Sequence, residues 1–166
     1  MFRIIYLSIS ATLFALIPLI VSAQETVPKA IYESAVRVHN SYFQIREMGD
    51  YEAAYTMFTD RQKENVSLDA FSQHWESVRE NFGRLTHLSN TKVTWYRNPK
   101  GAPEGLYAAI NFRASFERLP IYCGFLVWSI DEGYKLQREE MKFVKDGSGR
   151  PISNDKKEQA YAELSC

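Results

Sequence analysis

The sequence has few of the residues that hold metal ions in proteins. Its 166 residues include two cysteines, Cys123 and Cys166, and three histidines, His39, His74 and His87. Structural zinc sites need such residues in clusters at short spacings, and no such cluster occurs in this sequence. The sequence also lacks a glycine-rich phosphate loop, a nucleophile elbow and a dinucleotide-binding fingerprint. We therefore expect neither a metal ion nor a cofactor.

The sequence also lacks a surplus of charge. Twenty Lys and Arg residues balance twenty Asp and Glu residues, so the formal net charge is +0. Proteins that bind nucleic acid or anionic membranes through electrostatic attraction carry a basic surplus. We therefore expect neither nucleic acid nor an anionic membrane surface as a partner.

Long apolar runs are confined to the start of the chain. Residues 4–21 are mostly apolar after a single positive charge at Arg3, and small or apolar residues follow to Ala23. This pattern is typical of a secretory signal peptide at residues 1–23. It predicts a periplasmic or secreted protein that begins at Gln24 and has no stable membrane anchor. The alternative is an uncleaved anchor, since the run is near the lower length limit for spanning a bilayer.

The second half of the sequence alternates between apolar and polar side chains. In residues 106–116 the even positions are all apolar, and a period of two is typical of a strand with one buried face. Residues 121–130 and 134–144 continue as a hairpin around a turn at Gly133. Residues 85–97 are expected to hold one or two further strands. Together these segments predict an antiparallel sheet.

Three helices are expected before this sheet. Their apolar residues recur at spacings of three and four, which is typical of helices with one buried face. Gly49 ends the first helix, Asp50 begins a short second one, and Ser67 and Gly83 bound the third. Residues 59–65 are polar and are expected to be irregular or to form a helical turn.

Helices that precede an antiparallel sheet form an α+β domain. We expect this domain to span residues 24–144, with three N-terminal helices packed on the sheet. Residues 145–166 are expected to form a linker and a short C-terminal tail or helix. The apolar residues of the third helix are expected to face the sheet, and these are Phe71, Trp75, Val78 and Phe82.

The order of these elements resembles the nuclear-transport-factor-2-like superfamily, also called ketosteroid-isomerase-like. The matching features are Gly49-Asp50-Tyr51 between the first two helices, the Ser67 helix cap and the hairpin at residues 127–136. The chain looks closest to small secreted bacterial members of uncharacterised function. The resemblance implies a cone-shaped domain with a curved sheet, and sheet-to-sheet homodimers are frequent in that superfamily.

Some members of that superfamily are isomerases or dehydratases that use an Asp or His base with a Tyr or Asp donor. None of the three histidines here has a carboxylate at a spacing that would indicate an acid–base pair, so no catalytic residue can be assigned. Glu139 and Glu140 are neighbours on a strand and point to opposite faces. A solvated edge is the favoured interpretation of this pair, and one carboxylate facing the interior is the alternative.

Candidate binding residues are aromatic side chains suited to a pocket and arginines within strands, namely Tyr42, Tyr55, Trp95, Arg113, Trp128 and Arg138. An inward arginine would need a carboxylate or an anionic ligand as its partner, and the alternation favours solvent for Arg113. Leu136 and Arg138 share one parity, whereas Met141 and Phe143 have the opposite one. That switch predicts a β-bulge near Glu139.

The strand at residues 121–130 is apolar on both faces, so its second face needs a cover. The residues that need it are Ile121, Phe125 and Val127. A homodimer through the sheet is favoured, because the C-terminal tail has few large apolar groups. The tail would be the cover if a disulfide joined Cys123 to Cys166, as an even number of cysteines in an extracytoplasmic chain allows. A buried thiol at Cys123 with a free Cys166 is the equally supported alternative.

Three functions remain open. A non-catalytic secreted domain that binds a small apolar ligand or a partner protein is favoured, because the acid–base residues of an enzyme cannot be located. The alternatives are a pocket enzyme of the isomerase or dehydratase type and a structural protein associated with the cell envelope. A water-accessible interior holding His or Asp with Tyr would favour the enzyme, and an interior filled by Phe and Trp would favour the binding domain.

Overall fold

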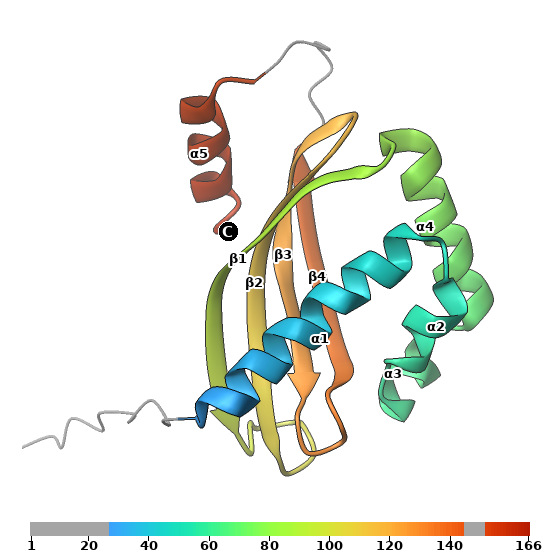
Figure 1. Ribbon diagram of the computed structural model, residues 1–166, viewed down its shortest axis with the longest axis vertical. Coiled ribbons are helices and arrows are strands. Elements are labelled where there is room, and N and C mark those ends of the chain that lie inside the picture. The colour runs from blue at the N-terminus through green and yellow to red at the C-terminus, as the bar shows by residue number, and fades with distance from the viewer. Residues whose placement is uncertain (1–26, 145–151) are drawn as a thin grey trace, which may run out of the picture.

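The computed structural model describes residues 27–144 and 152–166 (Figure 1). The expected signal peptide at residues 1–23 and the linker residues 145–151 lie outside the described residues. The elements are α1 (Lys29–Glu47), α2 (Tyr51–Thr56), α3 (Asp60–Asn65), α4 (Leu68–Phe82), β1 (Leu85–Arg97), β2 (Leu106–Phe116), β3 (Leu119–Ser129), β4 (Lys135–Val144) and α5 (Asn154–Glu163).

The four strands form one antiparallel sheet in the order β1-β2-β3-β4. The predicted α+β class is therefore confirmed, and residues 85–97 form a single strand. Helix α1 crosses one face of the sheet, and α2, α3 and α4 gather beside β4 (Figure 1). We call this face, which carries Ala108, Ile110 and Phe112 of β2, the inner face. The opposite face, which carries Tyr107, Ala109 and Arg113, is the outer face.

Four helices precede the sheet rather than the predicted three, because the polar residues 60–65 form α3. The hydroxyl of Thr59 accepts a hydrogen bond from the Gln62 backbone N–H at 3.1 Å, and Asp60 lies in the first turn. A side-chain cap and an acidic first turn stabilise even a short helix. No apolar stripe marks this segment, so its helix could be read only from the cap.

The other helix boundaries follow the predicted caps. Asp50 accepts from the Ala53 backbone N–H, and Ser67 accepts from that of Ala70. Gly83 ends α4 with a φ of 81°. A Cβ there would also collide with the side chain of Glu117, so glycine is required at this position for two reasons.

The main core lies between the inner face and helices α1, α2 and α4. Its large fully buried side chains are mostly aromatic and come from both layers, and they include Tyr42, Phe43, Phe58, Phe112 and Trp128. Phe71 and Trp75 of α4 are also buried, as predicted, whereas Val78 and Phe82 are only partly buried at its edge. Aromatic rings thus fill the space between the helices and the sheet.

A β-bulge interrupts β4. Val127 pairs with Arg138 and Trp128 pairs with Leu136, so Gln137 is an extra residue opposite β3. The bulge predicted near Glu139 is confirmed, with the extra residue two positions earlier. Because of it, the side chain of Glu139 returns to the inner face and bonds to α1.

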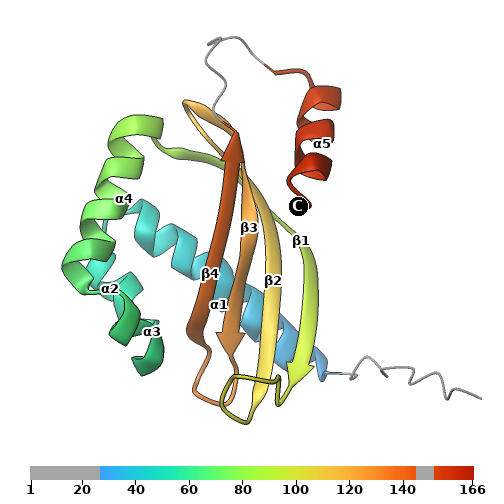
Figure 2. The same ribbon diagram turned by 180° about the vertical axis from the view of Figure 1, so that it is seen from behind.

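Helix α5 covers one part of the outer face (Figure 2). Tyr161 packs with Ile121 and Cys123 in a second apolar cluster, and a disulfide joins Cys123 to Cys166 with the Cα atoms 6.1 Å apart. Arg113 donates to the Glu158 carboxylate at 2.9 and 3.1 Å. The C-terminal segment is therefore the cover over Ile121.

A peptide map of protein from its native host tests the cross-link in the cell. We expect a Cys123–Cys166 pair under non-reducing conditions and a mature N-terminus at Gln24.

Loss of the bond in Cys166→Ser should lower the free energy of unfolding by about 3–4 kcal/mol, because the bond restricts the unfolded chain. Two free thiols would contradict the disulfide, and a chain that still begins at Met1 would contradict the signal peptide.

Candidate functional site

The inner core contains a buried ion pair. Arg46 of α1 donates from Nη1 to Glu139 Oε1 at 3.0 Å, and the Tyr42 hydroxyl donates to Glu139 Oε2 at 3.1 Å. The side chain of Arg46 is 5% exposed and that of Glu139 is 11% exposed. A buried charge requires such a partner, since desolvation without compensation is costly. Glu139 thus faces the interior, and the solvated edge favoured for both neighbouring carboxylates is wrong for this residue.

Aromatic rings surround the Arg46 guanidinium. Its Cζ lies 3.4 Å from the ring centroid of Trp75, 4.6 Å from that of Phe43 and 5.1 Å from that of Tyr42. A cation over the face of an aromatic ring is attracted by the ring quadrupole, most strongly when both are desolvated. This arginine therefore connects α1 to α4 as well as to β4.

His39 is a second buried polar group in the same core. Its Nδ1 accepts a hydrogen bond from Trp128 Nε1 at 3.2 Å. Burial and, to a smaller extent, the nearby Arg46 lower the pKa of His39 to about 3, while a hydrogen bond with Asn90 acts in the opposite direction. The imidazole is therefore neutral at physiological pH and is a weak base.

The remaining titratable groups of this core are also poorly suited to proton transfer. Burial raises the pKa of the Tyr42 phenol well above its usual range and raises that of Tyr122 as well. Burial also raises the pKa of the Glu139 carboxyl, while Arg46 opposes this effect. Both oxygens of that carboxylate already accept hydrogen bonds from Tyr42 and Arg46. This polar cluster therefore connects α1 to β4 within the core.

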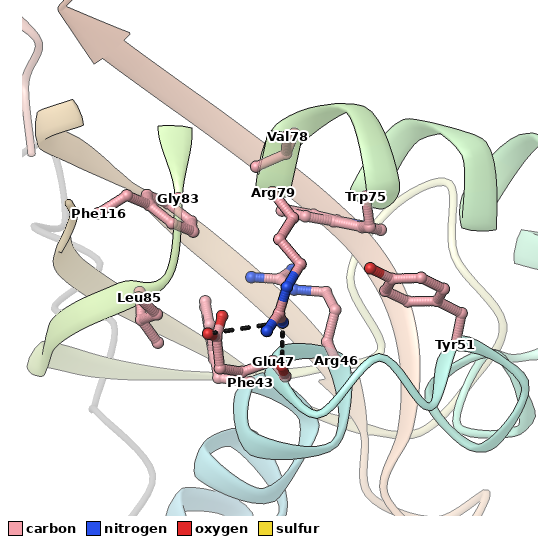
Figure 3. A pocket seen from close by; sticks show the side chains of 10 residues that line it. All are labelled: Phe43, Arg46, Glu47, Tyr51, Trp75, Val78, Arg79, Gly83, Leu85 and Phe116. Atoms are coloured by element: carbon pink, nitrogen blue, oxygen red, sulfur yellow. Dashed lines mark hydrogen bonds and ion pairs between the residues drawn. The ribbon is translucent and has the colours of Figure 1, made fainter. Parts of the chain in front are cut away.

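The cavity beside Arg46 is too small for a substrate. Figure 3 shows Arg46, Trp75 and Tyr51 among the side chains that line it, with Arg79 bonded to Glu47 at its edge. Its volume is about 20 Å³. A single water molecule needs about 10–15 Å³ on this measure, so the cavity has room for about one water.

A much larger hollow lies on the outer face, and we call it the outer hollow. Its volume is about 570 Å³, within the range of about 300–1,000 Å³ that is usual for ligand pockets. The floor consists of residues from β2 and β3, namely Tyr107, Ala109, Phe125 and Val127. The rim consists of residues from α3, the end of β1, the loop after it and β4, namely Arg61, Gln62, Asn65, Tyr96, Pro99, Lys100, Gly101, Ala102, Gln137 and Arg138.

Local structure explains how the rim is assembled. Arg61 of α3 donates from Nη1 to the Gly101 carbonyl at 3.2 Å, which connects the helix to the loop after β1. The bulge adds Gln137 to β4, and both Gln137 and its neighbour Arg138 line the hollow. The Arg138 guanidinium lies 5.5 Å from the ring centroid of Phe125. The bulge therefore directs Glu139 inward and leaves Arg138 on the outer rim.

The six binding residues named from the sequence do not meet at one place. Tyr42 and Trp128 lie together in the inner core, with ring centroids 5.9 Å apart. Tyr55 donates to the Val66 carbonyl at 2.9 Å, and Trp95 packs at the edge of the inner core. Arg113 is held by Glu158 under α5. Of the six, Arg138 is the residue that lines the outer hollow.

Sequence reasoning missed most of the outer hollow. Phe125 and Val127 carried a signal, since both were expected to need a cover on the second face of the sheet. Arg61 and Lys100 carried no signal, because they come from a short polar helix and a loop whose positions depend on the tertiary fold. Arg46 was missed for a similar reason, as its partner Glu139 is distant in the sequence.

Two kinds of feature are absent from the described residues. Within residues 27–144 and 152–166 no helix is long and apolar enough to cross a membrane. Over the same residues, no group of three or more His, Cys, Asp or Glu side chains is arranged to hold a metal ion.

Comparison with known proteins identifies a family. A family model described as a protein of unknown function, DUF4019, matches residues 39–137, from His39 in α1 to Gln137 in the bulge. No curated protein and no solved structure matches the chain. The matched segment is more than half of the sequence and contains α2, α3, α4 and β1 to β3 in full, so the chain belongs to the DUF4019 family.

Proposed function

We propose that this protein is a non-catalytic binding domain of the periplasm or the extracellular space, and that the outer hollow is its binding site. The observation that carries the proposal is the contrast between the two faces of the sheet. On the inner side, packed aromatic rings fill the core and leave a cavity of about 20 Å³ beside Arg46 and an open groove of about 340 Å³ between α1 and β1, whereas the hollow of the outer face measures about 570 Å³.

The chemistry of the hollow supports a ligand with a sizeable apolar part. Ligand pockets are mostly apolar, with a few polar groups that fix orientation. Tyr107, Ala109, Phe125 and Val127 supply an apolar floor, and Tyr96 on the rim is 47% exposed. An exposed aromatic side chain beside an apolar floor gives a ligand a large contact area.

The alternative of a pocket enzyme finds less support in the inner core. An acid–base site needs a base of suitable pKa within reach of a substrate. His39 has its pKa lowered to about 3, and the Glu139 carboxylate is occupied by Arg46 and Tyr42. We also propose that the chain is a cone-shaped member of the nuclear-transport-factor-2-like superfamily. The order of its elements, helices followed by an antiparallel sheet, supports this proposal.

Blocking the outer hollow should weaken ligand binding. The probe is 1-anilinonaphthalene-8-sulfonate, a fluorescent anion with an aromatic body. In Ala109→Phe a ring would project from the floor of the hollow, so we expect the affinity for the probe to fall at least about tenfold, which corresponds to about 1.4 kcal/mol. The measurement is a fluorescence titration of protein whose cooperative thermal transition shows that it is folded.

The matched control is Gln73→Phe, which adds the same ring at an exposed position of α4. This variant should bind the probe as the unchanged protein does. Equal affinities for all three proteins would show that the probe binds elsewhere and would contradict the proposed site.

A homodimer through the sheet is a second proposal for the same surface. Helix α5 covers Ile121, but Phe125 and Val127 are outside its apolar cluster and remain partly exposed. A dimer at this position would close the outer hollow. Sedimentation at micromolar concentration distinguishes the ligand site from the dimer interface. A protein that sediments only as a monomer would leave the hollow free for a ligand.

A further inference from the structure

We infer that the outer hollow selects a small amphipathic anion, an aromatic or other apolar body that carries one acidic group. This inference rests on the proposed binding site and adds the charge of its ligand. Such a ligand would place its apolar body on the apolar floor and its acidic group against a rim whose charged side chains are basic.

The residues that line the hollow are unbalanced in charge. Arg61, Lys100 and Arg138 line it, and no Asp or Glu is among its lining residues. The whole chain is formally neutral, so this imbalance is a local property of the surface. The three cations come from α3, the loop after β1 and β4, and the fold therefore gathers them around one floor.

The three cations differ in how far other groups neutralise them. Arg138 is paired with Glu140 at 2.7 Å, so its charge is largely compensated. Arg61 donates to the neutral carbonyl of Gly101, which orients the guanidinium and leaves its charge in place. No ion pair or hydrogen bond is found for the Lys100 side chain within the described part of the chain. Arg61 and Lys100 are therefore the groups that would bind an acidic group on a ligand.

The floor restricts what carries that acidic group. Phe125 and Val127 are partly exposed and present apolar surface, whereas Tyr107 and Ala109 are 1% and 8% exposed and lie beneath it. An inorganic anion would leave this apolar area exposed to water, whereas a molecule with an apolar body would cover it. A neutral apolar molecule would cover the floor but would gain nothing from Arg61 and Lys100.

Two naphthalene probes of nearly the same shape separate the charge from the apolar body. 1-Anilinonaphthalene-8-sulfonate carries a sulfonate, and N-phenyl-1-naphthylamine has the same rings without it. We expect the anionic probe to bind the full protein about tenfold more tightly at low salt. Its affinity should fall as salt is raised from about 0.02 to 0.5 M, because salt screens exposed charges, and that of the neutral probe should not.

Single variants assign this effect to the two cations. Arg61→Gln and Lys100→Gln should each weaken the anionic probe several-fold and leave the neutral probe unchanged. Lys63→Gln is the matched control, since Lys63 lies on the same helix but does not line the hollow. It removes the same charge from α3 and should change neither affinity.

The outcomes distinguish failure of the anion selectivity from failure of the proposed binding site. Equal binding of both probes, blocked by Ala109→Phe but unchanged in Arg61→Gln and Lys100→Gln, would overturn the anion selectivity and retain the binding site. Binding of the anionic probe that Ala109→Phe leaves unchanged would overturn both. An equal loss in Lys63→Gln and Arg61→Gln would show a general effect of net charge and would also overturn the inference.

Discussion

Glu139→Leu is expected to lower the free energy of unfolding by about 3–5 kcal/mol, because it leaves the Arg46 charge buried without its partner. Arg46 is 5% exposed, and its Nη1 has Glu139 as its carboxylate partner at 3.0 Å. The same substitution also removes the acceptor of the Tyr42 hydroxyl. Chemical denaturation at neutral pH measures this loss directly.

A double-mutant cycle separates the pair from the packing around it. Replacing both partners, as in Arg46→Met with Glu139→Leu, removes the stranded charge and should recover much of the lost stability. Glu140→Leu is the control on the neighbouring position, which faces outward, and it should change the free energy of unfolding by less than about 0.5 kcal/mol. A Glu139→Leu variant as stable as the control would show that the carboxylate is not buried against Arg46.

Trp75→Ala is the second substitution with a large expected effect. Trp75 is 4% exposed, its ring lies under the Arg46 guanidinium, and it also packs against Phe71. Large-to-small changes of a buried tryptophan cost about 3–5 kcal/mol, since apolar burial is lost and a cavity remains. We expect a loss of this size in a chemical melt.

The exposed residue Gln73 on the same helix provides the comparison. Gln73→Ala should be nearly neutral, because alanine is a good helix former and no packed contact is removed. If Trp75→Ala and Gln73→Ala had the same small effect, α4 would be rotated relative to the core described above.

Much of the fold could be predicted from local signals. Asp50, Ser67 and Gly83 marked helix ends, and the parity switch after Arg138 marked the bulge in β4. These signals are local, because a cap or an alternation depends on residues close in sequence. Helix α3 was one of two alternatives for a segment expected to be irregular or a helical turn, since six polar residues have no periodic pattern to decide between them.

The candidate site was much less accessible from the sequence. The bulge was predicted, but its consequence, Glu139 facing Arg46, depends on α1 and β4 meeting across the core. The outer hollow combines α3, a loop and the exposed half of the sheet, and only Phe125, Val127 and Arg138 had been singled out. Each of these contacts joins segments far apart along the chain, and residue patterns do not encode such distances.

The most direct test of where a ligand binds is a nuclear magnetic resonance titration of labelled protein with 1-anilinonaphthalene-8-sulfonate. We predict the largest shifts at the outer hollow, in the signals of Tyr107, Phe125 and Gln137, with little change in the inner core. The largest shifts at Tyr42, Phe43 and Trp128 would contradict this account, because they would require a binding chamber between the helices and the sheet.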